Sequence, residues 1–220
     1  MRCRAGRCGE IQWVGDGIAS NDISQTTTGV AFSHTHRLVY RDIKPENIGF
    51  DVRGDVKIFD FGLCKSLSPH LKAKGYGYRL TGRAGSLPYM APEVARMDTY
   101  DTKCDVFSFA ILLWEILSLL PAFKGLVPSE FVEHVVVRHE RPVVPLRNPY
   151  WPPLTRLMLP EAWDNDPAKR PDMKRVAILI RGDLNDMTDD IMILKRTKHM
   201  RNRSDHSFEF PPLSPPEMIK

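Results

Sequence analysis

Two short segments of the sequence carry residues that could transfer a phosphoryl group. Residues 40–47 read Y-R-D-I-K-P-E-N, and D-F-G begins at Asp60. In the first segment, Asp42 could accept a hydroxyl proton, and Lys44 and Asn47 follow it on the same short loop. Asp60 could hold a divalent cation facing them. Phosphoryl transfer needs a positioned nucleophile and cations that neutralise charge on the moving group, so these residue types favour that chemistry.

Length and composition agree with one compact domain. The 220 residues are 42% hydrophobic and 26% charged, which is an ordinary globular balance with enough apolar residues for a core. The formal net charge is +4, partly concentrated at positions 195–203. That basic run has no interleaved aromatic residues, so we expect a solvated tail and no nucleic-acid partner.

The cysteines and the apolar runs indicate the cellular location of the protein. None of the four cysteines forms a C-x-x-C pair, which indicates reduced thiols in an intracellular, cytoplasmic protein. The longest apolar run, Phe107–Leu120, is interrupted by polar residues and is shorter than the roughly 20 residues that span a bilayer. We therefore expect a core helix there, no membrane span and no signal peptide.

The elements that must position these residues are mainly helices. Two short apolar runs, Ile48–Phe50 and Val56–Phe59, flank D-V-R-G-D and predict a hairpin that presents Asp60 at a strand end. A helix is expected to end within 29–37, just before the first motif. Further helices are expected from a cap at Asp101 or Thr102 to 120, and over 129–138, 153–163 and 172–184.

Three further motifs occur in a fixed order after D-F-G. They are A-P-E at 91–93, D-V-F-S-F-A-I-L-L-W-E at 105–115 and D-P-A-K-R-P at 166–171. With the first two, they make the chain resemble a eukaryotic protein kinase of the serine/threonine or tyrosine-kinase-like type. The resemblance implies a mainly α fold, the kinase C-lobe, in which short β-hairpins carry the catalytic loop and D-F-G.

The resemblance also implies a division of the chain. Residues 22–185 resemble the C-lobe, residues 1–21 have no match, and residues 186–220 are expected to form a disordered tail, first basic and then proline-rich. Only 41 residues precede Asp42, too few for a glycine-rich loop, a strand lysine and a helix glutamate. We therefore expect the N-terminal β-lobe to be absent.

By this resemblance, the residues of the two motifs have distinct roles. Asp42 is the catalytic base, and Lys44 carries positive charge to the γ-phosphate of ATP. Asn47 and Asp60 are the Mg²⁺ ligands and so also contact the nucleotide. Tyr40 stands where the family usually has His, and an aromatic ring with a polar tip could pack beneath D-F-G in its place.

The resemblance assigns regulatory and substrate-binding roles as well. Arg41 resembles the arginine that clamps a phosphorylated activation loop, and Thr81 is the candidate switch in that loop. Ser86 occupies the hydroxyl position that bonds Asp42 and Lys44 in the substrate loop.

Three residues resemble the scaffold of the family. Glu93 and Arg170 resemble an ion pair that ties the activation segment to the lobe, and Asp105 resembles the helix residue that accepts backbone N–H groups from the catalytic loop.

The sequence leaves three interpretations open. The first is a serine/threonine protein kinase that transfers the ATP γ-phosphate to Ser/Thr hydroxyls of protein substrates, here in a truncated form. The second is an inactive C-lobe fragment or pseudokinase that acts as a protein-interaction module. The third is a nucleotide-independent scaffold, which the intact set of polar motif residues disfavours. No oligomeric state is predicted.

Overall fold

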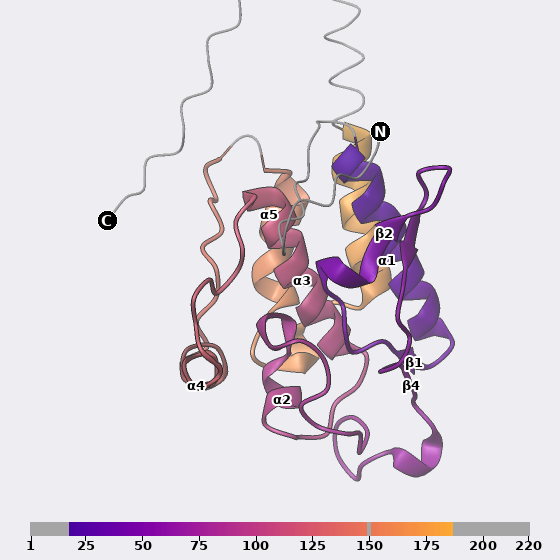
Figure 1. The fold of residues 1–220 in the computed structure, drawn as a ribbon, viewed down its shortest axis with the longest axis vertical. Coiled ribbons are helices and arrows are strands. Elements are labelled where there is room, and N and C mark those ends of the chain that lie inside the picture. Colours follow the sequence, from indigo (N-terminus) through magenta and orange to yellow (C-terminus); the bar gives the residue numbers. More distant parts are fainter. Residues whose placement is uncertain (1–17, 149–150, 187–220) are drawn as a thin grey trace, which may run out of the picture. The chain divides into compact units, whose positions relative to one another are not determined.

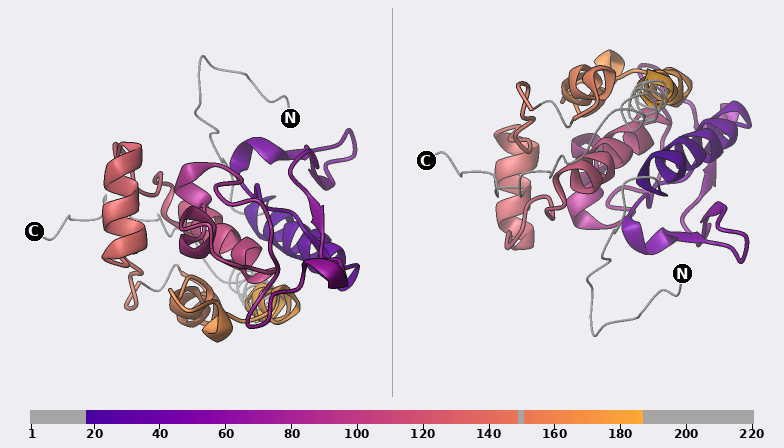
Figure 2. Two further views of the ribbon diagram at one scale, coloured as in Figure 1. Left: turned by 90° about the horizontal axis from the view of Figure 1, so that it is seen from below. Right: turned by 90° about the horizontal axis from the view of Figure 1, so that it is seen from above.

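The computed structural model describes residues 18–148 and 151–186, and this part of the chain is mostly helical (Figure 1). The long helices are α1 (Ile18–Thr35), α3 (Lys103–Ser118), α5 (Pro153–Ala162) and a further helix over residues 173–186. Helix α3 lies between α1 and α5 and contacts both (Figure 2). The mainly α class is therefore confirmed, and the calls for 1–17 and 187–220 lie outside the described residues.

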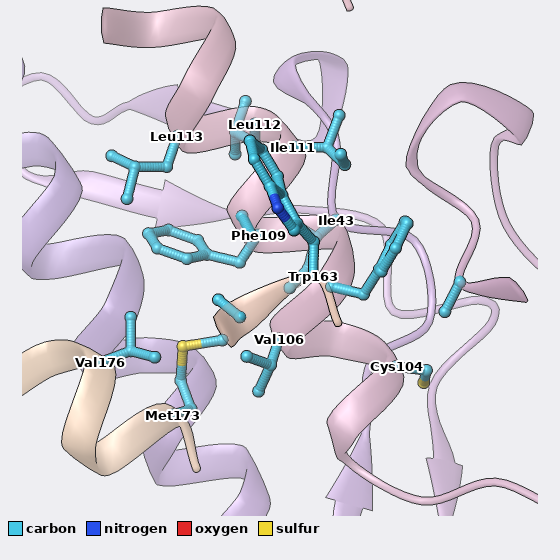
Figure 3. Close-up of a cluster of buried hydrophobic side chains, with 14 of the residues drawn as sticks. Ile43, Cys104, Val106, Phe109, Ile111, Leu112, Leu113, Trp163, Met173 and Val176 are labelled. Atoms are coloured by element: carbon cyan, nitrogen blue, oxygen red, sulfur yellow. The ribbon is translucent and has the colours of Figure 1, made fainter. Parts of the chain in front are cut away.

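Helix α3 is the centre of the core. Every residue from Cys104 to Leu113 is buried, as expected for a helix that is apolar on nearly all faces. Figure 3 shows its side chains in one cluster with residues from other elements, among them Ile43, Trp163, Met173 and Val176. Ile43, from the segment that carries Asp42, thus packs in the same buried cluster as α3.

The two ends of α3 follow from local chemistry. Thr102 precedes the helix but makes no side-chain cap, whereas Asp101 Oδ1 accepts the Lys103 N–H at 2.8 Å. Of the two predicted caps, Asp101 is the one whose side chain satisfies a free helix donor. At the other end Leu119 adopts φ 57° and its N–H bonds the Glu115 carbonyl, and Pro121 then prevents continuation.

Two antiparallel strand pairs enclose the motif segments. Strand β2 (Ile48–Phe50) pairs with β3 (Val56–Ile58), with Ile48 opposite Ile58, which confirms the predicted hairpin. Strand β1 (Leu38–Val39) pairs with β4 (Lys65–Ser66), a pairing that the sequence analysis did not predict. The catalytic loop, β2, β3 and D-F-G all lie between these outer strands along the chain.

The activation segment and the loops between helices hold short helical turns. They are η1 (Pro45–Asn47), η2 (Pro69–Leu71), η3 (Leu87–Tyr89), α2 (Pro92–Ala95) and η5 (Pro167–Lys169). All but η3 begin at a proline, whose missing N–H and fixed φ suit the first helical position, and in η3 the proline is the second residue.

The predicted helix at 129–138 is not a single α-helix. It begins as α4 (Pro128–Phe131) and continues as a π-helix, η4 (Val132–Val137). Adjacent Val135 and Val136 are both buried, as is Phe131. The i→i+5 hydrogen bonds of a π-turn let both valines face the same side as Phe131, which explains why a uniform 3.6-residue period is wrong here.

Helix α5 is capped by another helix. Pro152 precedes α5 and offers no capping side chain. Instead Asp183, which is buried on the helix over 173–186, accepts hydrogen bonds from Leu154 N at 2.9 Å and Thr155 N at 2.7 Å. A carboxylate at a helix N-terminus satisfies free donors and opposes the helix dipole. Within residues 18–148 and 151–186, no helix is both long and apolar enough to cross a bilayer.

Candidate active site

Asp42 lies at the centre of a compact polar network. Lys44 Nζ is 2.8 Å from Asp42 Oδ2, and Asn47 Nδ2 donates to the same oxygen at 2.9 Å. Ser86 Oγ and N donate to Asp42 Oδ1 at 2.9 and 3.0 Å. Lys44 Nζ also donates to Ser86 Oγ at 2.9 Å. The structure therefore brings Asp42, Lys44, Asn47 and Ser86 together in one hydrogen-bonded network.

This network sets the ionisation of Asp42. Burial alone would raise the pKa of its carboxyl, but hydrogen bonds from Lys44, Ser86 and Asn47 together outweigh burial and lower the pKa below its ordinary value. Asp42 is consequently a carboxylate at neutral pH. It can accept a proton or a hydrogen bond without first losing a proton to solvent.

The catalytic loop is held from below by α3. Asp105 is fully buried, and its two oxygens accept the N–H groups of Tyr40 and Arg41 at 2.8 and 2.7 Å. His34, near the end of α1, contacts Asp105 Oδ2 through Nε2 at 2.8 Å. Arg41 has φ 73°, a left-handed conformation that a non-glycine residue adopts only where its surroundings enforce it. Asp105 supplies that enforcement.

The D-F-G segment lies at the end of the β2–β3 hairpin. The Phe59 N–H bonds the Asn47 carbonyl at 2.8 Å, so Asn47 and Asp60 flank the same end of the hairpin. Tyr40 donates its hydroxyl to the Phe59 carbonyl, and its ring meets Phe61 edge-on with centroids 5.4 Å apart. Tyr40 thus packs beneath D-F-G. Asp60 has φ 53°, and its Oδ1 accepts the Gly62 N–H at 3.0 Å.

The oxygens at this end of the hairpin fit a hard cation. Asn47 is buried and commits its amide nitrogen to Asp42, which leaves its amide oxygen as the ligand group, while Asp60 is exposed. Among the described residues, no three His, Cys, Asp or Glu side chains are grouped as a metal site. Mg²⁺ commonly uses one or two protein oxygens together with phosphate oxygens and water, so this donor set suits a cation that is shared with a nucleotide.

A buried ion pair fixes the end of the activation segment. Arg170 donates to both oxygens of Glu93, at 2.7 and 2.8 Å, and both residues are almost fully buried. The Arg170 guanidinium also lies over the ring of Phe107, 5.1 Å from its centroid, and Arg141 lies 4.9 Å from the same centroid. The pair therefore connects α2 directly to the central helix.

Arg41 makes no hydrogen bond to the Thr81 side chain. Its Nε donates to the Leu63 carbonyl at 2.6 Å and its Nη1 to the Tyr100 hydroxyl at 3.1 Å. Tyr100 in turn donates to the Thr81 carbonyl at 2.6 Å. The two residues expected to form a switch are thus linked through Tyr100, and the Thr81 side chain is exposed.

Sequence reasoning missed His34, Tyr100 and a contact between Tyr89 and Glu115. The Tyr89 hydroxyl donates to Glu115 Oε2 at 2.7 Å, which ties the substrate-loop end of the activation segment to α3. Burial raises the pKa of Glu115 despite this bond. Glu115 interrupts the apolar run of α3. A single charged residue in that run was the one signal in the sequence that could have predicted a polar partner for it.

Comparison with known proteins agrees with this geometry. The family model described as "Protein kinase domain" matches residues 10–177. The chain belongs to the protein kinase domain family. Dual specificity protein kinase shkB of Dictyostelium discoideum is 38% identical over 154 residues, which are 69% of this chain and 22% of that protein.

Other relatives are similar at the same level. Serine/threonine-protein kinase STY17 of Arabidopsis thaliana is 32% identical over 162 residues, covering 74% of this chain and 27% of that protein. Mitogen-activated protein kinase kinase kinase 7 of Bos taurus is 34% identical over 157 residues, covering 69% of this chain and 25% of that protein. The chain thus spans about a quarter of these relatives and corresponds to part of a kinase domain.

Proposed function

We propose that residues 22–185 form the C-terminal lobe of a serine/threonine protein kinase of the tyrosine-kinase-like type. The observation that carries this proposal is the network of Asp42, Lys44, Asn47 and Ser86. It joins a carboxylate, an ammonium group and a hydroxyl in one hydrogen-bonded cluster, beside the hairpin end that holds Asp60. Residues 1–21 and 186–220 lie outside this proposed lobe.

In the proposed reaction, each group has one task. Asp42 accepts a hydrogen bond, and then the proton, from the Ser or Thr hydroxyl of a protein substrate. Lys44 lies 2.8 Å from Asp42 and places a positive charge where the γ-phosphate of ATP would pass. Asn47 and Asp60 would hold Mg²⁺, which neutralises phosphate charge when bound.

Regulation is proposed to run through Arg41 and Thr81. A phosphate on Thr81 would add about −1.5 to −2 charge near an arginine that already reaches the Thr81 carbonyl through Tyr100. Arg41 follows Tyr40 in the loop that carries Asp42, so a phosphate that engages Arg41 would brace that loop.

We propose that phosphate transfer also depends on groups outside the motifs described above. A kinase also needs a glycine-rich loop over the phosphates, a strand lysine and a helix glutamate. We infer that these groups belong to an N-terminal lobe and that phosphate transfer requires it. Without that lobe, the chain would act at most as a protein-interaction module.

The test is Asp42→Asn in a protein completed with an N-terminal lobe encoded upstream of about Asp22. We expect phosphorylation of Ser or Thr by the completed protein and loss of about 10³-fold or more in kcat on substitution, with ATP binding nearly unchanged. Radiolabel transfer and nucleotide titration measure the two quantities. Activity that survives the substitution would remove Asp42 as the base, and transfer mainly to Tyr would refute the substrate class.

A further inference from the structure

The activation segment carries an unusual distribution of charge. From Phe61 to Pro92 the sequence has five Lys or Arg residues and no Asp or Glu. We call these five residues the cationic set: Lys65, Lys72, Lys74, Arg79 and Arg83. All five are exposed. A run of this length without an acidic residue is a strong local bias in a chain whose net charge is only +4.

The cationic set has no internal counterion. None of its side chains forms an ion pair with a carboxylate of residues 18–148 or 151–186. The carboxylates that follow the cationic set in the chain are already engaged: Asp98 pairs with Arg96, Glu93 with Arg170, and Asp101 accepts the Tyr76 hydroxyl and the Lys103 N–H. The positive charge is therefore directed outward.

Backbone bonds hold this charge on an ordered surface. Lys72 is bridged to Tyr78, and the Arg79 N–H bonds the Leu71 carbonyl at 2.7 Å, which forms a tight reversal. Tyr78 and Tyr100 exchange backbone hydrogen bonds of 2.8 and 3.2 Å, which fasten the reversal to the segment before α3. Three of the five cations, those at 72, 74 and 79, thus lie on one anchored turn.

The same segment leads directly into the acceptor network. The Arg83 N–H bonds the Val94 carbonyl at 2.9 Å, and three residues later Ser86 contacts Asp42. A peptide whose hydroxyl sits at Asp42 would therefore extend beside the cationic set. Outward positive charge next to a binding site attracts and orients anionic ligands.

We propose that the cationic set binds acidic residues of the protein substrate, so that the favoured acceptor Ser or Thr lies next to clustered Asp or Glu. This inference rests on the proposed kinase function and names its substrate class. It requires no phosphate on Thr81, because the cations are in place without one.

The test measures binding by the 220-residue chain itself, with no phosphate transfer. Fluorescein-labelled peptides of equal length carry a central Ser flanked by Glu, by Gln or by Lys, and anisotropy gives each Kd. We expect the Glu peptide to bind most tightly and to weaken as salt is raised to about 0.5 M, since exposed charges are screened. Lys74→Glu with Arg79→Glu should weaken the Glu peptide roughly tenfold.

The matched control reverses two exposed cations elsewhere, Lys124→Glu with Arg181→Glu, and should change binding less than about twofold. Circular dichroism verifies that both variants fold. Equal binding of the Glu and Gln peptides, or equal losses in the two variants, would overturn the proposal. So would tighter binding of a single-stranded oligonucleotide of matched charge. Because no turnover is measured, these outcomes leave the Asp42→Asn test of the kinase function untouched.

Discussion

At the scale of single residues, Ser86 is part of the assembled site and Thr81 is not. Ser86 bonds both Asp42 and Lys44, whereas the Thr81 side chain is exposed and its carbonyl alone is engaged. Ser86 and Thr81 therefore differ in their surroundings, in agreement with the separate roles that the sequence analysis expected for them.

We predict that Ser86→Ala lowers kcat of the completed kinase whatever the state of Thr81. The substitution removes the Oγ bonds to Asp42 and Lys44, each a charge-assisted bond of roughly 1.5–3 kcal/mol, so a loss of about tenfold or more is expected. Thr81→Ala should remove only the gain that phosphorylation brings, and Arg41→Ala should erase the same gain.

Steady-state kinetics with mass spectrometry of the active form separates these roles. Full activity in Thr81→Ala, with no loss in Arg41→Ala, would defeat the switch. A Ser86→Ala enzyme that keeps the wild-type kcat would show that the Ser86 hydroxyl does not contribute to catalysis.

Motif spacing predicted which polar side chains gather at the site, but not every partner. Asp42, Lys44 and Asn47 share one short loop, so their proximity is largely local. The support from His34 was not predicted, because it depends on where α1 ends relative to α3. Tyr100 links Arg41 to Thr81 by hydrogen bonds to both. It was missed for the same reason, because packing between distant segments creates these contacts.

At the scale of elements, periodicity succeeded where a helix or hairpin is regular. The long helix and the β2–β3 hairpin were predicted because their apolar spacing and turn residues are strong local signals. The π-helix η4 was not, because its hydrogen-bond pattern depends on which side chains are buried, and the β1–β4 pair was not, because it joins two very short segments that are separated along the chain. Two-residue strands such as β1 carry too few positions for a period to be read.

The cap of α5 by Asp183 gives an element-scale prediction. Asp183→Ala would leave the Leu154 and Thr155 N–H groups without their acceptor, and we expect a loss of about 2–3 kcal/mol in the free energy of unfolding. Urea unfolding should show a lower midpoint with an unchanged slope.

The matched control is Asp186→Ala, because Asp186 is exposed on the same helix. This substitution should change the free energy of unfolding by less than about 0.5 kcal/mol. Equal shifts in both variants would mean that the carboxylate at 183 acts through helix propensity or net charge and not as a cap.

At the scale of the whole molecule, the described residues leave the proposed nucleotide side of the site exposed. Phe59 and Phe61, which flank Asp60, are 49% and 57% exposed, whereas Asp42 is 7% exposed. Among the described residues, Asp42 is thus buried while the phenylalanines beside Asp60 are uncovered. Large exposed aromatic side chains beside a functional residue indicate a surface that another part of a protein covers.

We therefore predict that the 220-residue chain binds Mg·ATP far more weakly than a complete kinase domain. The Asn47 and Asp60 oxygens remain available, but residues 18–148 and 151–186 include no strand lysine positioned to hold the α- and β-phosphates. Isothermal titration calorimetry with and without Mg²⁺ should give a Kd well above the micromolar range. Micromolar or tighter affinity would show that these residues suffice for nucleotide binding.

The pairing of β1 with β4 has a consequence for how the site folds. Leu38 opposite Ser66 closes a loop shorter than the separation of 65 residues between Tyr40 and Asp105, and the β2–β3 pairing inside that loop shortens it further. Contacts of short sequence separation cost little closure entropy and form early. We expect the segment carrying Asp42 and Asp60 to acquire its shape before the lobe is complete, and Asp105 on the distant α3 to lock it last.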